Sequence, residues 1–151
     1  MKFERRKSAG YLINHLARLF AQALRRRMEA EGVGVGQFPV LLALWEAEGA
    51  TQTALAERLA IEQPTMANTL KRMERDGLIE RVPDPEDRRQ ARVHLTPRAR
   101  ALEAVLTGAA RAANEAALAG LEPEEREQFL ALVRRVIANL EQDHEGRSQN
   151  G

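Results

Sequence analysis

Residues 51–96 read TQTALAERLAIEQPTMANTLKRMERDGLIERVPDPEDRRQARVHLT, and this stretch decides the fold. Its first half predicts two short helices joined by a tight turn. Thr51 is a typical N-cap for the first helix, and Pro64 stands near the start of the second, where its missing N–H is not needed. Asp76 and Gly77 are typical of the end of that second helix. The first half is therefore predicted to be a helix-turn-helix.

The second helix, residues 64–75, has two distinct faces. On a helical wheel of about 3.6 residues per turn, Met66, Leu70 and Met73 fall on one side and are predicted to face a core. The other side carries polar residues that can donate or accept hydrogen bonds: Thr65, Asn68, Thr69, Arg72 and, at its edge, Lys71. Such side chains match base edges in a DNA major groove, whereas a helix face that meets only solvent more often carries Glu and Lys.

The second half of the stretch predicts a β-hairpin. Residues 78–82 and 91–95 have the composition of two short strands, and the segment between them holds prolines and an arginine pair. A hairpin of this kind beside a recognition helix is a wing, and an arginine near its tip suits the adjacent minor groove. The combination predicts a DNA-binding protein rather than an enzyme.

The remaining composition excludes several classes of site. The chain has no cysteine, which removes disulfides and thiolate zinc sites and agrees with a reducing cytoplasm, so we predict a cytoplasmic protein. His15, His94 and His144 are far apart and lack metal-ligand spacing, so neither a metal nor another cofactor is predicted. No Ser-His-acid spacing or nucleotide loop indicates a catalytic site. Polar residues interrupt the apolar segment 11–28, which argues against a signal peptide or a membrane span.

Helical patterns flank the stretch on both sides. Residues 12–28 and 37–47 repeat apolar side chains at helical spacing before it. After it, Thr96 caps an apolar helix that ends before Gly120, and a last helix begins near Pro123. The apolar stripe of the last helix is regular: Phe129, Leu132, Val133, Val136, Ile137 and Leu140.

These flanking helices are predicted to join two copies of the chain, because apolar stripes without a partner in a small module usually find one in a second copy. In such a homodimer the two recognition helices lie about 34 Å apart, one turn of DNA, on a pseudo-palindromic site. The predicted fold class is mainly α with a small β-wing. The predicted boundaries are an N-terminal dimerisation helix at residues 1–32, a winged helix-turn-helix DNA-binding module at 33–96, C-terminal dimerisation helices at 97–145 and a flexible tail at 146–151.

The sequence resembles the MarR family of bacterial regulators, in particular its SlyA-type members. The segments that carry the resemblance are Gln37–Leu41, Gly49–Ala56, Ile61–Met66, Arg72–Ile79, and Asp87–Arg89 leading to Leu95-Thr96. Their order and spacing match over roughly residues 11–142. The resemblance implies a dimeric winged-helix repressor or activator, with a repressor expected here. It also implies that a small phenolic or carboxylate ligand can lower the affinity for DNA.

The resemblance further implies roles for individual residues. Arg88 is expected to enter the minor groove, with Asp87 holding its guanidinium and Arg89 nearer phosphate. Asn68 stands where SlyA-type proteins tend to have Arg, so their base preference does not carry over. The full set of expected DNA-binding residues is Thr51, Thr53, Gln63, Pro64, Thr65, Asn68, Thr69, Lys71, Arg72, Asp87, Arg88 and Arg89.

An effector pocket is expected where the dimer helices meet the DNA-binding module. Tyr11, His15 and Trp45 are the candidates, because each combines an apolar body with a polar tip. The alternative for each is a core residue whose polar group is satisfied by a backbone partner. For the whole protein, the alternative function is a winged-helix protein-interaction module without sequence-specific DNA binding. The polar helix face and the wing arginines argue against it.

Bulk charge does not decide between these functions. Residues 62–92 carry seven basic and seven acidic side chains, a net charge of zero, so DNA binding must depend on where each charge is placed. The N-terminal run Arg25, Arg26 and Arg27 is compatible both with a solvated helix face and with phosphate contact.

Overall fold

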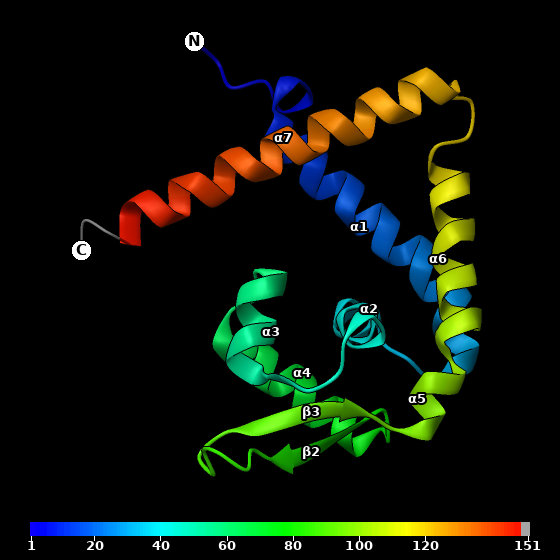
Figure 1. Ribbon diagram of the computed structural model, residues 1–151. Helices are drawn as coiled ribbons and strands as arrows, with labels where there is room; N and C mark the ends of the chain where they lie inside the picture. The colour runs from blue at the N-terminus through cyan, green and yellow to red at the C-terminus, as the bar shows by residue number, and fades with distance from the viewer. Residues whose placement is uncertain (149–151) are drawn as a thin grey trace. The chain divides into compact units, whose positions relative to one another are not determined.

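The computed structural model describes residues 1–148 and is mainly helical with a small antiparallel sheet, as the sequence predicted (Figure 1). The chain divides into two compact units, residues 1–113 and a second unit that begins at residue 114. The main elements, in chain order, are α1 Ala9–Met28, α2 Phe38–Glu46, β1 Ala50–Thr51, α3 Gln52–Leu59, α4 Gln63–Arg75, β2 Ile79–Pro83, β3 Ala91–Leu95, α5 Pro97–Ala101, α6 Glu103–Ala117 and α7 Pro123–Ser148. Short 3-10 turns lie at Arg5–Lys7, Glu29–Glu31 and Val35–Gln37.

The helix-turn-helix consists of α3 and α4. Thr51 caps α3 by accepting a hydrogen bond from the backbone N–H of Ala54 at 3.2 Å, as predicted. The turn to α4 begins at Ala60, whose φ of 52° lies in the left-handed region that alanine rarely adopts. Gly77, with a φ of 72°, follows the end of α4, which confirms the predicted stop.

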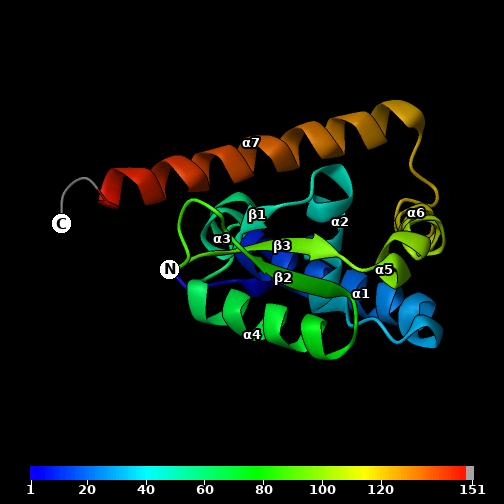
Figure 2. The ribbon, with the colours of Figure 1, turned by 60° about the horizontal axis from the view of Figure 1, so that its bottom comes forward.

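The wing belongs to a three-stranded antiparallel sheet of order β1-β3-β2. The predicted hairpin is confirmed: β2 and β3 pair with Ile79 opposite Leu95 and Pro83 opposite Ala91, and Figure 2 shows them running along α4. The third strand, β1, was not predicted. It pairs Ala50 with Val93, and at two residues it is too short to show the alternating pattern that marks a strand in a sequence.

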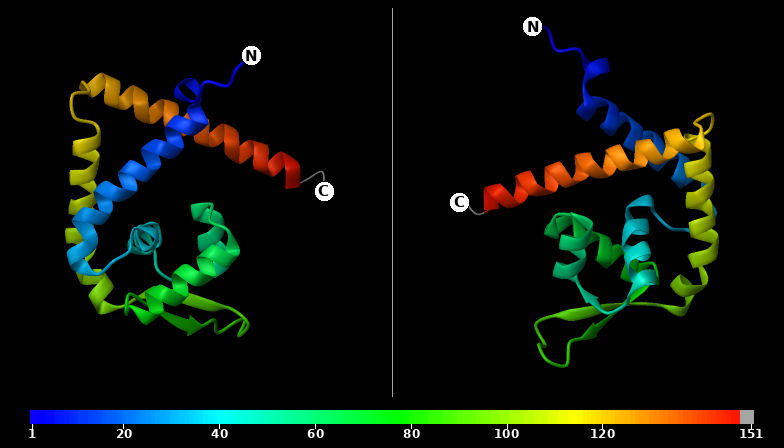
Figure 3. Two further views of the ribbon diagram at one scale, coloured as in Figure 1. Left: turned by 180° about the vertical axis from the view of Figure 1, so that it is seen from behind. Right: turned by 45° about the horizontal axis from the view of Figure 1, so that its top comes forward.

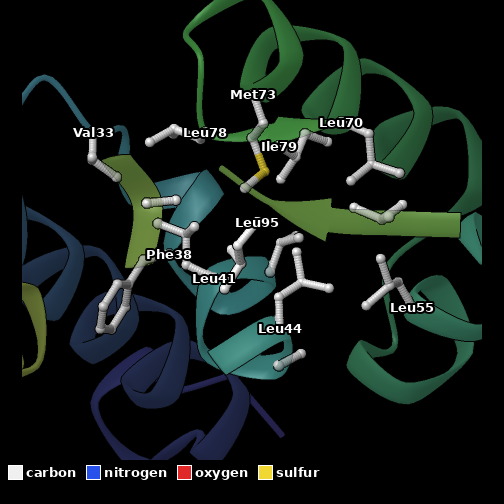
Figure 4. Close-up of a cluster of buried hydrophobic side chains, with 14 of the residues drawn as sticks. Val33, Phe38, Leu41, Leu44, Leu55, Leu70, Met73, Leu78, Ile79 and Leu95 are labelled. Atoms are coloured by element: carbon white, nitrogen blue, oxygen red, sulfur yellow. The ribbon is translucent and has the colours of Figure 1, made fainter. Parts of the chain in front are cut away.

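One hydrophobic cluster holds the first unit together, with α2, α3 and α4 packed around the sheet (Figure 3). Leu41 and Leu44 of α2, Leu55 of α3, and Leu70 and Met73 of α4 meet in it, each at most 1% exposed (Figure 4). Burial of side chains of this size contributes about 1.5–3 kcal/mol each. Core packing therefore fixes which face of α4 is buried.

Helix α1 is mostly outside this cluster. It begins at Ala9, slightly earlier than predicted, because the Ser8 hydroxyl caps it by accepting from the Tyr11 N–H at 3.3 Å. Met28 is its only buried residue among the twenty. Its apolar side chains in the first three turns are between 37% and 48% exposed: Leu12, Ile13, Leu16 and Leu19.

The helix predicted from Pro97 onward is interrupted. Thr96 caps it as predicted, accepting from the Ala99 N–H at 3.2 Å, but α5 ends after five residues and α6 begins at Glu103. Between them, the Leu102 N–H donates to both Arg98 O at 3.2 Å and Ala99 O at 3.3 Å. This shared bond tightens the helix locally into a short 3-10-type turn.

The second unit contains the end of α6 and the whole of α7. Helix α7 begins at Pro123 as predicted, and the Glu125 carboxylate caps it by accepting from the Glu122 N–H at 2.9 Å. No residue of this 26-residue helix is buried, and its predicted stripe is half-buried at Phe129 and exposed from Leu132 to Leu140. Of the predicted tail, residues 146–148 form the end of α7, and residues 149–151 lie outside the described residues. None of the helices in residues 1–148 has an apolar stretch long enough to cross a membrane.

Candidate nucleic-acid interface

The candidate recognition surface is the exposed face of α4. Met66, Leu70 and Met73 on the opposite face are each 0% exposed, as the helical wheel predicted. The polar residues expected on the recognition face are exposed or half-buried: Gln63, Pro64, Thr65, Asn68, Thr69, Lys71 and Arg72. Within the described chain the side chains of Thr65, Asn68 and Arg72 make no hydrogen bond, so their donors and acceptors are available to a partner.

The start of α3 lies close to the start of α4. Gln52 Nε2 donates to Gln63 Oε1 at 3.3 Å and so links the two N-terminal turns. Thr53 is exposed, and Thr51, which carries the cap, is half-buried. The N-terminus of α3, with its free backbone N–H groups and positive end of the helix dipole, therefore faces the same region as the start of α4.

The acidic turn of the wing is organised from within. Asp84 is only 6% exposed; its Oδ1 accepts from the Glu86 N–H at 2.9 Å, and its Oδ2 lies 3.4 Å from Arg92 Nη2. The Asp84 N–H in turn donates to Gln90 O at 3.0 Å, which closes the hairpin. Arg92 Nη1 also donates to Gly49 O at 3.0 Å, so the wing is tied to the segment before β1. The Asp84 carboxylate therefore stabilises the turn and is not exposed as a free charge.

At the wing tip the structure pairs the charges differently from the sequence analysis. Asp87 was expected to hold the Arg88 guanidinium, but its Oδ1 accepts from the Arg89 N–H at 3.1 Å and lies 3.5 Å from Arg89 Nε. The reason is local: an aspartate two residues before an N–H forms an Asx-type turn without moving the backbone. Arg88 is exposed and has no ion pair within residues 1–148.

A pocket of about 300 Å³ lies between the start of α3 and the wing. Thr51 and Thr53 line it from α3, and Arg81 and Arg89 line it from the hairpin. Arg81 Nε is buried with no hydrogen-bond partner in the described chain, although Glu74 Oε2 lies 3.5 Å away. The lining holds two guanidinium groups and no carboxylate, and the carboxylates of Glu74 and Asp87 each lie 3.5 Å from one of these groups.

A separate cluster around Glu48 anchors the far end of the wing. Its carboxylate accepts from Arg100 Nη2 at 2.9 Å, Arg100 Nε at 3.1 Å and the Leu95 N–H at 2.8 Å, while His94 Nδ1 lies 3.5 Å away. The Arg100 hydrogen bonds, with smaller help from Leu95 and His94, lower the pKa of Glu48 below its ordinary value. The cluster thus joins the end of β3 to α5 through a charged group.

The three candidate ligand residues are not brought together. Tyr11 and His15 are neighbours on α1, with ring centroids 6.3 Å apart, and Arg5 lies 5.6 Å from the Tyr11 ring centroid. Trp45 packs edge-on against Phe38, and its Nε1 donates to the Ala99 carbonyl at 3.1 Å. The polar tip of Trp45 is therefore already satisfied by the backbone.

Several residues of this region were missed by the sequence analysis. Gln52, Arg81 and Gln90 line the pocket, and Glu48 and Arg92 anchor the wing. No local pattern marks the contacts of Arg81 or Glu48, because their partners lie elsewhere in the chain. The turn formed by Asp84 did carry a signal, since aspartate before proline favours such turns.

Comparisons with known proteins agree with this architecture. Residues 35–91 match the model of the MarR family. The transcriptional regulator HosA of Escherichia coli is 33% identical over 125 residues, which cover 82% of this chain and 93% of HosA. The structure of the regulator SlyA has the same fold, with a TM-score of 0.81 and 24% identity over 87% of this chain and 92% of that one.

Two similar structures belong to regulators whose ligands have been studied. The PcaV regulator of Streptomyces coelicolor, in complex with its natural ligand, has a TM-score of 0.81 and 28% identity, covering 91% of this chain and 97% of PcaV. BpsR of Bordetella bronchiseptica, whose DNA binding is regulated by 6-hydroxynicotinic acid, has a TM-score of 0.82 and 25% identity, covering 90% and 97%.

The Glu48 cluster predicts a pH-dependent contribution to stability. Because the folded-state pKa of Glu48 lies below its ordinary value of 4.5, the stabilisation is present above about pH 4.5 and is lost as the pH falls through the folded pKa. Glu48→Gln should lower the free energy of unfolding by about 1–2 kcal/mol at pH 7, and the difference should shrink at pH 3.5. Urea denaturation at both pH values measures this, with Glu46→Gln as an exposed matched control. A Glu48→Gln effect that is the same at both pH values would contradict the assignment.

Proposed function

The chain belongs to the MarR family of transcriptional regulators, and we propose that it binds double-stranded operator DNA as a homodimer, with α4 in the major groove and the wing in the adjacent minor groove. The observation that carries this proposal is the division of α4 into a fully buried apolar face and a polar face on which Thr65, Asn68 and Arg72 make no hydrogen bond within residues 1–148. We further propose that the protein represses transcription and works in the cytoplasm, where it reaches chromosomal DNA.

The chemistry of α4 supports base recognition. Asn68 can form two hydrogen bonds with adenine and Arg72 two with guanine, and Thr65 can approach either base or the methyl group of thymine. The other residues proposed to contact DNA from this helix lie at its start or beside these side chains: Gln63, Pro64, Thr69 and Lys71. Because core packing fixes which face of α4 is buried, these side chains already lie on the exposed face before DNA arrives, so that only their rotamers must be ordered on binding.

The wing and the pocket beside it supply the backbone contacts in this proposal. A DNA phosphate in the pocket would meet Arg81, Arg89 and the hydroxyl groups of Thr51 and Thr53, and it would give the buried Arg81 Nε a hydrogen-bond acceptor. Arg88, exposed at the tip, is then the wing residue free to enter the minor groove. In this arrangement Asp87 orders the tip through Arg89.

The exposed apolar residues of α1 and α7 support dimerisation. Neither helix buries its stripe within the described chain: α1 has one buried residue and α7 has none. Exposed apolar area on this scale is typical of a protein–protein interface. We therefore assign residues 1–32 and 97–145 to dimerisation and residues 33–96 to DNA binding.

A small aromatic carboxylate is the proposed effector, by analogy with the ligand-regulated relatives. The proposed contacts are Tyr11, whose ring lies under the Arg5 guanidinium, and the neighbouring His15, with Trp45 as a further candidate. A carboxylate would find in Arg5 a charge partner beside an aromatic surface. Binding of such a ligand is proposed to lower the affinity for DNA.

Arg88→Ala tests the wing contact. If Arg88 makes a base-edge contact, this variant should bind operator DNA more weakly by about 1–3 kcal/mol. If it meets only phosphate, the loss should be smaller and the slope of log affinity against log salt should fall by about one. Fluorescence anisotropy across a salt series measures both quantities. Arg147→Ala, near the end of α7, is the matched control, since it removes one positive charge outside the segments assigned to DNA binding and dimerisation. An Arg88→Ala affinity equal to that of the wild type would remove Arg88 from the interface.

A paired set of α7 variants tests dimerisation. Val133→Glu combined with Val136→Glu places two charges on the apolar stripe and should yield a single-chain mass in sedimentation equilibrium, because an unpaired buried charge costs several kcal/mol. Ala131→Glu combined with Ala138→Glu adds the same two charges to the opposite face, since these positions lie about half a turn away, and should keep the two-chain mass. A monomeric wild type, or a stripe variant that stays dimeric, would refute the proposed interface.

A further inference from the structure

The C-terminal end of α4 is held by side chains from two other segments. Gln37 Nε2, from the turn before α2, donates to Asp76 Oδ2 at 2.9 Å. Arg98, on α5, donates from Nη1 to the Asp76 carbonyl at 2.6 Å and from Nη2 to the Glu31 carbonyl at 3.1 Å. Arg98 therefore bridges the residue that ends α4 and the turn that directly follows α1.

These contacts are specific and well oriented. Gln37 is only 7% exposed, and its Oε1 accepts from the Gly34 N–H at 3.0 Å, so both ends of its amide are used. The hydrogen bond from Gln37, followed by that from Arg75, lowers the pKa of Asp76, so the carboxylate is charged at neutral pH. Hydrogen bonds to a charged group are roughly twice as strong as neutral ones. The end of α4 is thus tied to residues 31–37 by polar contacts in addition to core packing.

These contacts at the end of α4 can affect the position of its start, which is the part proposed to meet DNA. The thirteen residues of α4 span about 19 Å, and the tie lies at the end opposite to Pro64 and Thr65. A rotation of about 10° about the tied end would move the start of α4 by about 3 Å, close to the 3.4 Å rise per base pair along one strand. A small rotation of α4 about Asp76 would therefore move the start of the helix by about the rise of one base pair.

We propose that Gln37, Asp76 and Arg98 form a clamp that sets the position of α4 relative to α1, and thereby the spacing between half-sites that the dimer accepts. This inference rests on the proposed function, because it takes α1 as part of the dimer interface and α4 as the recognition helix. The clamp residues are positioning residues: they act through α4 and through the turn after α1, and they are not assigned a contact with bases.

The test begins with the wild-type full chain. Bound sequences are selected from a random-sequence duplex library, and the selected operator is then rebuilt with one base pair added or removed between its half-sites. The wild type should lose about tenfold or more in affinity for each altered spacing, because the half-sites move out of register. Arg98→Met keeps an apolar stem but removes both hydrogen bonds. This variant should lose less than about threefold in affinity for each altered spacing. Gln37→Met removes the hydrogen bond to Asp76 and should likewise reduce the loss of affinity for operators of altered spacing.

Two controls separate a positioning role from general damage. Arg147→Met removes one positive charge from an exposed arginine near the end of α7, outside the segments assigned to dimerisation and DNA binding, and it should keep wild-type spacing discrimination. A duplex with a single half-site reports the integrity of one winged helix. Arg98→Met and Gln37→Met should bind it within about twofold of the wild type.

Each outcome has a definite meaning. A wild type that selects no paired half-sites overturns the proposed function and the clamp with it. A wild type that discriminates spacing, together with clamp variants that discriminate equally well, overturns the clamp alone. If the clamp variants lose affinity for the single half-site as strongly as for the operator, the clamp residues act only in folding. That result also overturns the clamp proposal. Relaxed spacing with intact half-site binding supports the clamp.

Discussion

The burial of Met66, Leu70 and Met73 is the constraint on which the rest of the structure depends. These side chains fix the rotation of α4 about its own axis, because turning the helix would expose them to water at a cost of several kcal/mol. Once that face is buried, helical geometry places the polar side chains of the opposite face at the surface. The polar face proposed for recognition is therefore exposed as a consequence of core packing.

Polar interactions hold the wing and the end of α4 in addition to core packing. Asp84 closes the wing turn and meets Arg92, Glu48 joins β3 to α5 through Arg100, and Asp76 accepts Gln37. This is relevant to how residues 62–92, which carry no net charge, can suit DNA. Asp76 and Asp84 of this segment, and Glu48 before it, serve as internal acceptors, while Arg88 remains exposed. Charge placement, rather than total charge, therefore determines which charges face outward.

Most of the module could be predicted from sequence because its signals are local. The N-caps Thr51 and Thr96, the stop at Gly77 and the apolar spacing of α4 each depend on residues a few positions apart, and all are confirmed. The features that escaped prediction depend on distant partners or on very short elements. Strand β1 exists only because β3 is beside it, and the break at Leu102 follows from one shared hydrogen bond. The pairing of Asp87 with Arg89 differs from the role that the resemblance implied for Asp87.

The central claim, specific recognition of DNA by this dimer, is tested most directly by fluorescence-anisotropy binding to the DNA flanking its own gene against a scrambled duplex, from about 50 to 200 mM salt. The account predicts tighter binding to the flanking DNA, two chains per site, and an affinity whose logarithm falls linearly with the logarithm of salt concentration. Equal affinity for the two duplexes at every salt concentration, together with no enriched sequence in genome-wide selection of bound DNA, would contradict it. The alternative of a winged-helix module that binds protein instead of DNA would then be favoured.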